Sequence, residues 1–175
     1  LAQGAGIRVT LLAQVSEKPL PEEAQAARDA WLAADGVIHQ FNIPWPQDVD
    51  LIIDGLLGTG LQNAPRDNMV SLIEQANHFP APIIALDIPS GLNAQTGATP
   101  GAVIQAAYTI TFIALKPGLL TGKARDVVGQ LRHHALGLEA WLTQQPTHLN
   151  RLDASQLAQW FRSEEHTSEL QSHSG

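Results

Sequence analysis

The sequence predicts an α/β fold in which a mostly parallel sheet carries helices on both faces. Two observations support this prediction. Runs of β-branched and aliphatic residues alternate with stretches of helical spacing, and two of the apolar runs end in an aspartate that glycine-rich chain follows. Alternating strands and helices are typical of parallel sheets joined by right-handed crossovers. We therefore expect a three-layer, Rossmann-like arrangement.

The expected strands are short apolar runs bounded by proline, glycine or polar residues. They cover residues 7–15, 37–41, 49–54, 83–87, 108–115 and 130–134. Residues 1–6 have the composition of a last helical turn that ends on glycine.

Three helices are expected between and after these strands. The first opens at residues 19–23, where prolines suit the first turn and two glutamates match the positive end of the helix dipole. Its expected inner face is Ala24, Ala27, Trp31 and Ala34, and its expected end is Gly36. Asp67 is expected to cap the second, whose inner face is Met69, Leu72, Ile73 and Ala76. Residues 138–144 form the third.

Two aspartates indicate where a ligand binds. Asp54 and Asp87 each end a predicted strand, and ligands of parallel α/β folds bind beyond the carboxyl ends of the strands. The glycine-rich chain after each aspartate allows backbone N–H groups to approach a ligand closely. The sequence therefore predicts a small-molecule site around Asp54, Gly58 to Gly60 and Asp87.

Each feature also has a structural interpretation. An acid at a strand end is often a turn former, so Asp54 taken alone fits either role. Gly58-Thr59-Gly60 lacks the third glycine of the dinucleotide fingerprint, where Asn63 stands, which disfavours an ordinary nicotinamide dehydrogenase.

Two further motifs are interpreted as structural. Ser90 is not expected to be a nucleophile, because Ile88 replaces the first glycine of a nucleophile elbow. His133 and His134 are expected to be surface and edge residues, because adjacent strand residues point to opposite faces.

Composition narrows the class of protein. Hydrophobic residues make up 44% and charged residues 15% of the 175 residues, which indicates a globular domain. The net charge of −7 argues against nucleic-acid binding. No cysteine is present, which excludes disulfides and thiolate chemistry, and no apolar run is long enough to cross a bilayer. These features favour a cytoplasmic enzyme that binds neither nucleic acid nor membrane.

The motifs taken together resemble the NAD(P)H-hydrate epimerase family over roughly residues 1–145. The matching runs are VDLIIDGLLGTGL (49–61), ALDIPSGL (85–92), TG (96–97), ALKPG (114–118) and GK (122–123). The resemblance is greatest to the epimerase half of bacterial bifunctional repair enzymes. It implies a repair reaction in which the R and S forms of hydrated NADH and NADPH are interconverted. A stereospecific dehydratase can then convert the S form back to NADH or NADPH.

The resemblance also assigns residues. It implies that the hydrated dinucleotide contacts Asp87 and the loop Gly58, Thr59, Gly60, Leu61, Gln62, Asn63 and Ala64. It implies that Asp54 and Ser90 help to hold a potassium ion, which oxygen ligands suit. Asp87 is expected to move the proton, with Lys116 as a helper. The hydroxyl departing and returning, or the ring opening and reclosing, both satisfy these roles.

The resemblance leads to expectations about chain organisation. Residues 1–148 are expected to be an epimerase domain without the family's Asn-Asn-Gly-Gly-Asp-Gly phosphate loop, so we expect weak binding of hydrated NADH or NADPH and slow turnover, if any. Residues 149–161 are expected to lead into an ADP-dependent dehydratase domain, with a capping box at LDASQL. Residues 162–175 resemble a translated sequencing adapter and are left out of the fold prediction. The alternative is a non-catalytic nucleotide- or partner-binding module of the same fold, and homo-oligomers are an expectation of the family.

Overall fold

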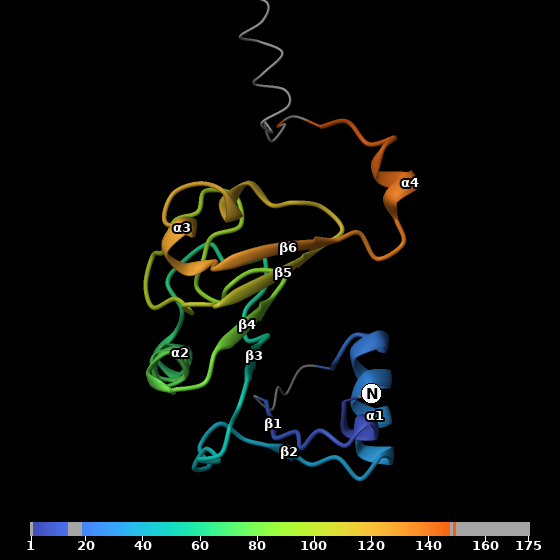
Figure 1. Ribbon diagram of the computed structural model, residues 1–175, viewed down its shortest axis with the longest axis vertical. Coiled ribbons are helices and arrows are strands. Elements are labelled where there is room, and N and C mark those ends of the chain that lie inside the picture. The colour runs from blue at the N-terminus through green and yellow to red at the C-terminus, as the bar shows by residue number, and fades with distance from the viewer. Residues whose placement is uncertain (1, 14–18, 148, 150–175) are drawn as a thin grey trace, which may run out of the picture.

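The computed structural model describes residues 2–13, 19–147 and 149, and within them two parallel sheets (Figure 1). The smaller sheet pairs β1 (Leu11–Leu12) with β2 (Ile38–His39). The larger has the order β3-β4-β5-β6, all parallel, from strands β3 (Ile52–Asp54), β4 (Ile83–Leu86), β5 (Tyr108–Phe112) and β6 (Gln130–His134). The predicted α/β class with a parallel sheet is confirmed.

The register of the larger sheet brings the strand ends to one edge. Asp54 lies beside Ala85 of β4, and Leu86 lies beside Ile110 of β5. Phe112 lies beside His134, the last residue of β6. The predicted strand included Asp87, but β4 ends at Leu86 and Asp87 follows it directly. Both predicted acids therefore stand at the carboxyl edge of the sheet.

The helices are α1 (Glu22–Ala33), α2 (Asp67–His78), α3 (Ala124–Val127) and α4 (Glu139–Leu142). Two 3₁₀ turns, η1 (Gln3–Ala5) and η2 (Pro117–Leu119), complete the described elements. As expected from the sequence, the chain turns at Gly6 after η1, in the left-handed conformation (φ 78°). Neither α3 nor η2 was predicted, because each is a single turn that is too short to show a periodicity.

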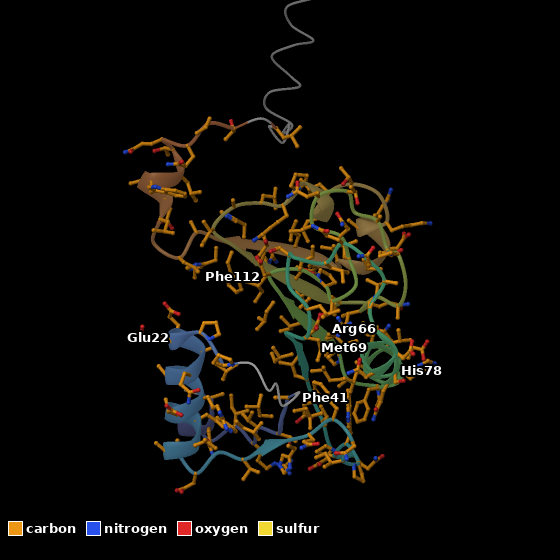
Figure 2. All side chains as sticks on the ribbon, turned by 180° about the vertical axis from the view of Figure 1, so that it is seen from behind. Glu22, Phe41, Arg66, Met69, His78 and Phe112 are labelled. Atoms are coloured by element: carbon orange, nitrogen blue, oxygen red, sulfur yellow. The ribbon has the colours of Figure 1, made fainter. Side chains whose placement is uncertain are left out.

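Helix α2 buries the predicted face. Leu72, Ile73 and Ala76 are buried and Met69 is half-buried. Figure 2 shows Arg66 and Met69 at the start of this helix and His78 at its end. Asp67 does not cap it: Arg66 occupies the capping position without a side-chain cap, and Asp67 is the first helical residue. An acid is favourable there too, because it lies at the positive end of the helix dipole.

Helix α1 differs from the prediction. It contains no buried residue, so the predicted inner face of Ala24, Ala27, Trp31 and Ala34 is wrong as a core face. Trp31 is half-buried, against Gly36, where an added Cβ would lie 2.2 Å from the indole Cε2 atom. Gly36 therefore provides room for the indole and stands two residues beyond the end of the helical turn at Ala34.

Two apolar clusters form the core. One joins α2 to β4 and the chain before β5 through Ile73, Ala76, Ile83, Ala85, Ile104 and Ala106. The other joins the chain after β4 to η2 and α3 through Ile88, Leu92, Ala94, Leu119, Ala124, Val127 and Val128. The side chains of Ile53, Leu86 and Tyr108 on the opposite face of the sheet are exposed. The chain after Asp87 is thus anchored in the core, which gives the site a rigid wall.

No helix among the described residues is long and apolar enough to cross a membrane. Of the predicted domain boundaries, the segments 150–161 and 162–175 lie outside the described residues, so both stay predictions.

Candidate functional site

Asp54 and Ser90 form a buried pair at the end of β3. The Asp54 carboxylate accepts hydrogen bonds from Ser90 N (2.8 Å), Ser90 Oγ (2.6 Å) and Leu56 N (3.2 Å). The Ser90 hydroxyl also accepts from Leu57 N at 2.9 Å and lies 3.3 Å from Leu57 O. Asp54 is 2% exposed and Ser90 1%. Two residues that are 36 positions apart in sequence therefore form one cluster of oxygen atoms.

The electrostatics of this pair favour a cation. Burial raises the pKa of Asp54, and its hydrogen bonds from Ser90 and Leu56 oppose that rise only in part. All of these donors are neutral, so the charge of the carboxylate is uncompensated in a poorly solvated place. Carboxylate, hydroxyl and carbonyl oxygens are ligands that hard cations accept. Within the described part of the chain, no three His, Cys, Asp or Glu side chains gather as they would around a multivalent metal ion.

Asp87 has a different environment at the end of β4. Its Oδ1 atom accepts from Phe112 N (3.1 Å) and Thr111 Oγ1 (3.2 Å) and forms an ion pair with Lys116 Nζ. Lys116 is held in place by Phe112 O (2.8 Å) and Thr111 Oγ1 (3.1 Å). Burial raises the pKa of Asp87, but Lys116, Phe112 and Thr111 together lower it, and the net pKa is below the usual value.

The backbone near Asp87 is strained. Asp87 has φ 69° and Ile113, one residue beyond β5, has φ 63°. Left-handed values are tolerated by aspartate but are costly for a β-branched residue. Such strain persists where the surrounding structure enforces it, and it concentrates at functional sites. The bonds from Asp87 N to Ile110 O (2.7 Å) and from Ile113 N to His134 O (2.9 Å) enforce it here.

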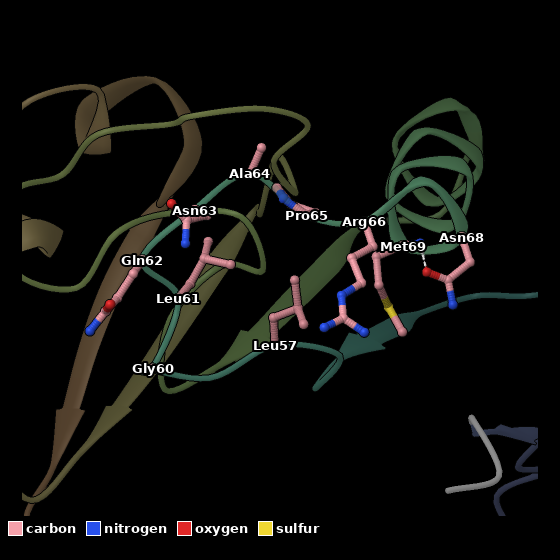
Figure 3. A pocket seen from close by; sticks show the side chains of 10 residues that line it. All are labelled: Leu57, Gly60, Leu61, Gln62, Asn63, Ala64, Pro65, Arg66, Asn68 and Met69. Atoms are coloured by element: carbon pink, nitrogen blue, oxygen red, sulfur yellow. Dashed lines mark hydrogen bonds between the residues drawn. The ribbon is translucent and has the colours of Figure 1, made fainter.

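The loop between β3 and α2 borders two cavities. The larger, of about 450 Å³, is lined by Leu57, residues 60–66, Asn68 and Met69, and Figure 3 shows how the loop runs past it into α2. The smaller, of about 200 Å³, is lined by Leu57, Gly58, Gly60 and Leu61. Of the predicted substrate-binding loop, Gly58, Gly60, Leu61, Gln62, Asn63 and Ala64 line one or both cavities, whereas Thr59 and Asp87 line neither. Most of the predicted loop therefore lines these two cavities, and Asp87 is outside both linings.

Backbone hydrogen bonds bring together the glycine motifs found in the sequence. Gly118 N donates to Ala94 O (2.7 Å), and Lys123 N donates to Gly97 O (2.8 Å). A Cβ at Gly118 would lie 2.1 Å from Asn93 O, so no larger residue fits. These glycines hold the turn after Ser90 against η2, which orients Lys116 just before it.

Two participants were not predicted from the sequence. Thr111 is fully buried and contacts both Asp87 and Lys116, and Asn93 links the Ser90 turn to the loop through Leu61 O (3.0 Å). The available signal for Thr111 was a polar residue at an inward-facing position of an apolar strand. His133 and His134 are exposed on β6, as expected, and bond to Ile113 O and to Leu136 N respectively.

Comparison with known families identifies the chain. Residues 1–118, which include Asp54, the loop, Asp87, Ser90 and Lys116, match the model of the YjeF-related protein N-terminus. The chain belongs to this family. The YjeF-related domain thus contains both strand-end aspartates and the cavity-lining loop.

The chain is similar in sequence to three relatives whose names refer to NAD(P)H-hydrate repair or epimerisation. The Bifunctional NAD(P)H-hydrate repair enzyme Nnr of Escherichia coli is 62% identical over 173 residues, covering 99% of this chain and 34% of the relative. The Bifunctional NAD(P)H-hydrate repair enzyme of Leishmania braziliensis is 51% identical over 81% of this chain and 26% of the relative. The NAD(P)H-hydrate epimerase of Bordetella bronchiseptica is 35% identical over 79% of this chain and 61% of the relative. The chain thus spans about a third or less of the bifunctional relatives.

A solved structure supports the fold. The crystal structure of yeast ynu0 superposes with a TM-score of 0.61 over 86% of this chain and 66% of that chain. The sequences are 14% identical, so this likeness concerns the fold alone.

Proposed function

We propose that the chain binds hydrated NADH or NADPH and interconverts its R and S epimers. One observation carries the proposal: among the described residues, every hydrogen bond and ion pair of the Asp87 carboxylate falls on Oδ1, and Oδ2 has no such partner. The carboxylate is thus fixed in orientation, held ionised by Lys116, and left with one oxygen able to accept a proton. The names of the relatives from Escherichia coli and Bordetella bronchiseptica support the choice of substrate.

In this proposal Asp87 is the base and Lys116 the acid. A carboxyl with a lowered pKa is ionised at neutral pH, so it accepts a proton rather than supplying one. The Lys116 ammonium lies against the same carboxylate and carries the proton that the substrate needs in return. By hydroxyl loss, Lys116 protonates the departing hydroxyl as the C–O bond breaks and water leaves, and Asp87 takes a proton from the water that adds to the other face of the same carbon; Asp87 then returns a proton to Lys116. By ring opening, Asp87 takes the hydroxyl proton and Lys116 protonates the ring nitrogen as the C–N bond breaks, and both transfers reverse when the ring closes on the other face. A group positioned in this way commonly contributes about 10²–10⁴-fold to the rate.

We further propose that Asp54 and Ser90 bind a potassium ion. The buried oxygens of Asp54 and Ser90, together with the carbonyl oxygen of half-buried Leu57, fit a hard monovalent cation, and a bound cation would offset the cost of keeping Asp54 ionised. When bound, the ion supplies positive charge near an anionic dinucleotide. Ser90 and Asp54 would then orient the start of the Gly58–Ala64 loop through Leu56 N and Leu57 N.

The decisive experiment measures epimer interconversion directly. Purified R-form hydrated NADH is incubated with the chain, and the S form is followed by chromatographic separation. We expect conversion with the wild type and a loss of about 10²-fold or more in kcat for Asp87→Asn, with an unchanged circular dichroism spectrum. Asp126→Asn, at an exposed acid in α3, is the matched control and should convert normally. Conversion by Asp87→Asn at the wild-type rate would remove Asp87 from the mechanism, whereas binding without any conversion by the wild type would favour the non-catalytic binding module.

A further inference from the structure

Asn93 connects the two loops of the site. It lies three residues after Ser90, and its Nδ2 donates to Leu61 O at 3.0 Å. Its Oδ1 accepts from Gln95 N (3.0 Å), Thr96 N (2.9 Å) and Thr96 Oγ1 (3.0 Å). The acceptor half of the amide therefore closes a turn in its own loop, and the donor half reaches across 32 residues of sequence to the loop that borders the cavities.

The two loops differ in how firmly they are held. Leu92 and Ala94, on either side of Asn93, are buried, and Asn93 N and O bond to Ala98 O (2.8 Å) and Gly97 N (2.9 Å). In contrast, Gly58 and Gly60 are exposed, and a Cβ added at either would meet nothing within 4 Å. The bond from Asn93 to Leu61 therefore ties a weakly packed loop to a rigid turn.

We propose that Asn93 is a positioning residue that holds the Gly58–Ala64 loop in the conformation that binds the dinucleotide. This inference rests on the proposed function. A loop that visits its binding conformation only part of the time lowers the apparent affinity by that fraction. The Asn93 side chain makes no hydrogen bond to Asp87, Lys116 or Thr111, although its backbone lies against Gly118, two residues after Lys116. A substitution that keeps the turn but loses the bond to Leu61 therefore affects substrate binding and leaves proton transfer intact.

Substitutions at position 93 can separate the accepting function of the side-chain amide from its donating function. Asn93→Asp retains an oxygen that accepts from Gln95 N and Thr96 N but cannot donate to Leu61 O, which it would face with a second acceptor. Asn93→Ser is a second variant, because a serine hydroxyl closes a similar turn but is too short to reach Leu61. Thr96→Val is the matched control: it disturbs the same turn at Thr96 Oγ1 and leaves the bond from Asn93 to Leu61 in place.

The test combines hydrogen–deuterium exchange with steady-state kinetics on the full chain. Asn93→Asp and Asn93→Ser should speed exchange of the amides of residues 58–64 by about threefold to tenfold, as the loss of one hydrogen bond predicts. KM for hydrated NADH should rise by a similar factor, with kcat within about twofold of wild type.

The outcomes separate this inference from the proposed function. Exchange at 58–64 equal to wild type in both variants, or an equal rise in Thr96→Val, would overturn the role of Asn93. A fall in kcat with KM unchanged would also overturn it, because positioning acts on binding here. Absence of epimerisation by the wild type would refute the proposed function alone, since the exchange data do not depend on turnover.

Discussion

Ser90→Ala is the sharpest test of the buried pair at the end of β3. The change deletes a donor to the Asp54 carboxylate at 2.6 Å and the acceptor of Leu57 N at 2.9 Å. A hydrogen bond to a charged group contributes about 1.5–3 kcal/mol, and an unsatisfied buried donor costs about 1–3 kcal/mol. Because Leu57 is only half-buried and the two effects overlap, we expect a total loss of about 2–4 kcal/mol in the free energy of unfolding at pH 7.5.

The loss should depend on pH with a definite sign. The Ser90 bonds lower the pKa of Asp54 against the effect of burial, so their removal raises that pKa further. The cost of the ionised carboxylate is complete above its folded pKa and is relieved as pH falls through that value toward the unfolded pKa. Ser90→Ala should therefore be less destabilising at pH 5 than at pH 7.5.

Urea unfolding at the two pH values measures both quantities. Ser71→Ala is the matched control: it deletes a hydroxyl that bonds to Asp67 O on the exposed side of α2, and it should change stability by no more than about 0.5 kcal/mol. A loss in Ser90→Ala as small as that of the control, or one equal at both pH values, would show that Asp54 is not an ionised carboxylate held by Ser90.

Three other perturbations have clear expected outcomes. Lys116→Gln should raise the pKa of Asp87 and so move the acid limb of the pH profile of kcat to higher pH, with kcat reduced about 10²-fold. An acid limb at the wild-type pH would show that Lys116 does not lower the pKa of Asp87. Gly91→Ala should destabilise by more than about 2 kcal/mol in thermal unfolding, because φ is +100° and its Cβ would lie 2.2 Å from a backbone oxygen, whereas Gly58→Ala has open space and should be nearly neutral. Potassium chloride should raise Tm more than lithium chloride at equal ionic strength, and this difference should disappear in Asp54→Asn; a difference that persists would place the ion elsewhere.

Sequence periodicity predicted the fold well where an element packs on the core. Helix α2 shows apolar residues at positions 69, 72, 73 and 76, and three of these four are buried. The same reasoning was wrong for α1, where alanines at similar spacing remain exposed. Alanine fits a helix in either setting, so its spacing carries little information about burial. A face needs a packing partner, and the periodicity of one helix does not show whether that partner exists.

The site was predictable only in part, for a related reason. Strand-end position pointed to Asp54 and Asp87 because parallel strands end at a common edge. The contacts of Ser90 with Asp54 and of Asn93 with Leu61 join residues more than thirty positions apart, and nothing in their local sequence indicates the pairing. Ser90 was assigned through the resemblance to a family, and Asn93 and Thr111 were missed because each belongs to a turn or strand that looks complete by itself.

The two strand-end aspartates have opposite electrostatic environments, and this difference assigns their proposed roles. Asp54 is 2% exposed and its partners are all neutral, so burial raises its pKa and its ionised form lacks a compensating charge. Asp87 has the Lys116 ammonium beside it, and the net pKa lies below the usual value. A carboxylate already paired with an internal cation has little to gain from a metal ion, but it remains ionised and can accept a proton through its free oxygen. Asp54 is too deeply buried to reach a substrate as a base, but its carboxylate without a neighbouring positive charge can bind a cation. Exchanging the two proposed roles would require moving Lys116, so under this proposal the position of this one side chain decides which aspartate would bind the ion and which would move the proton.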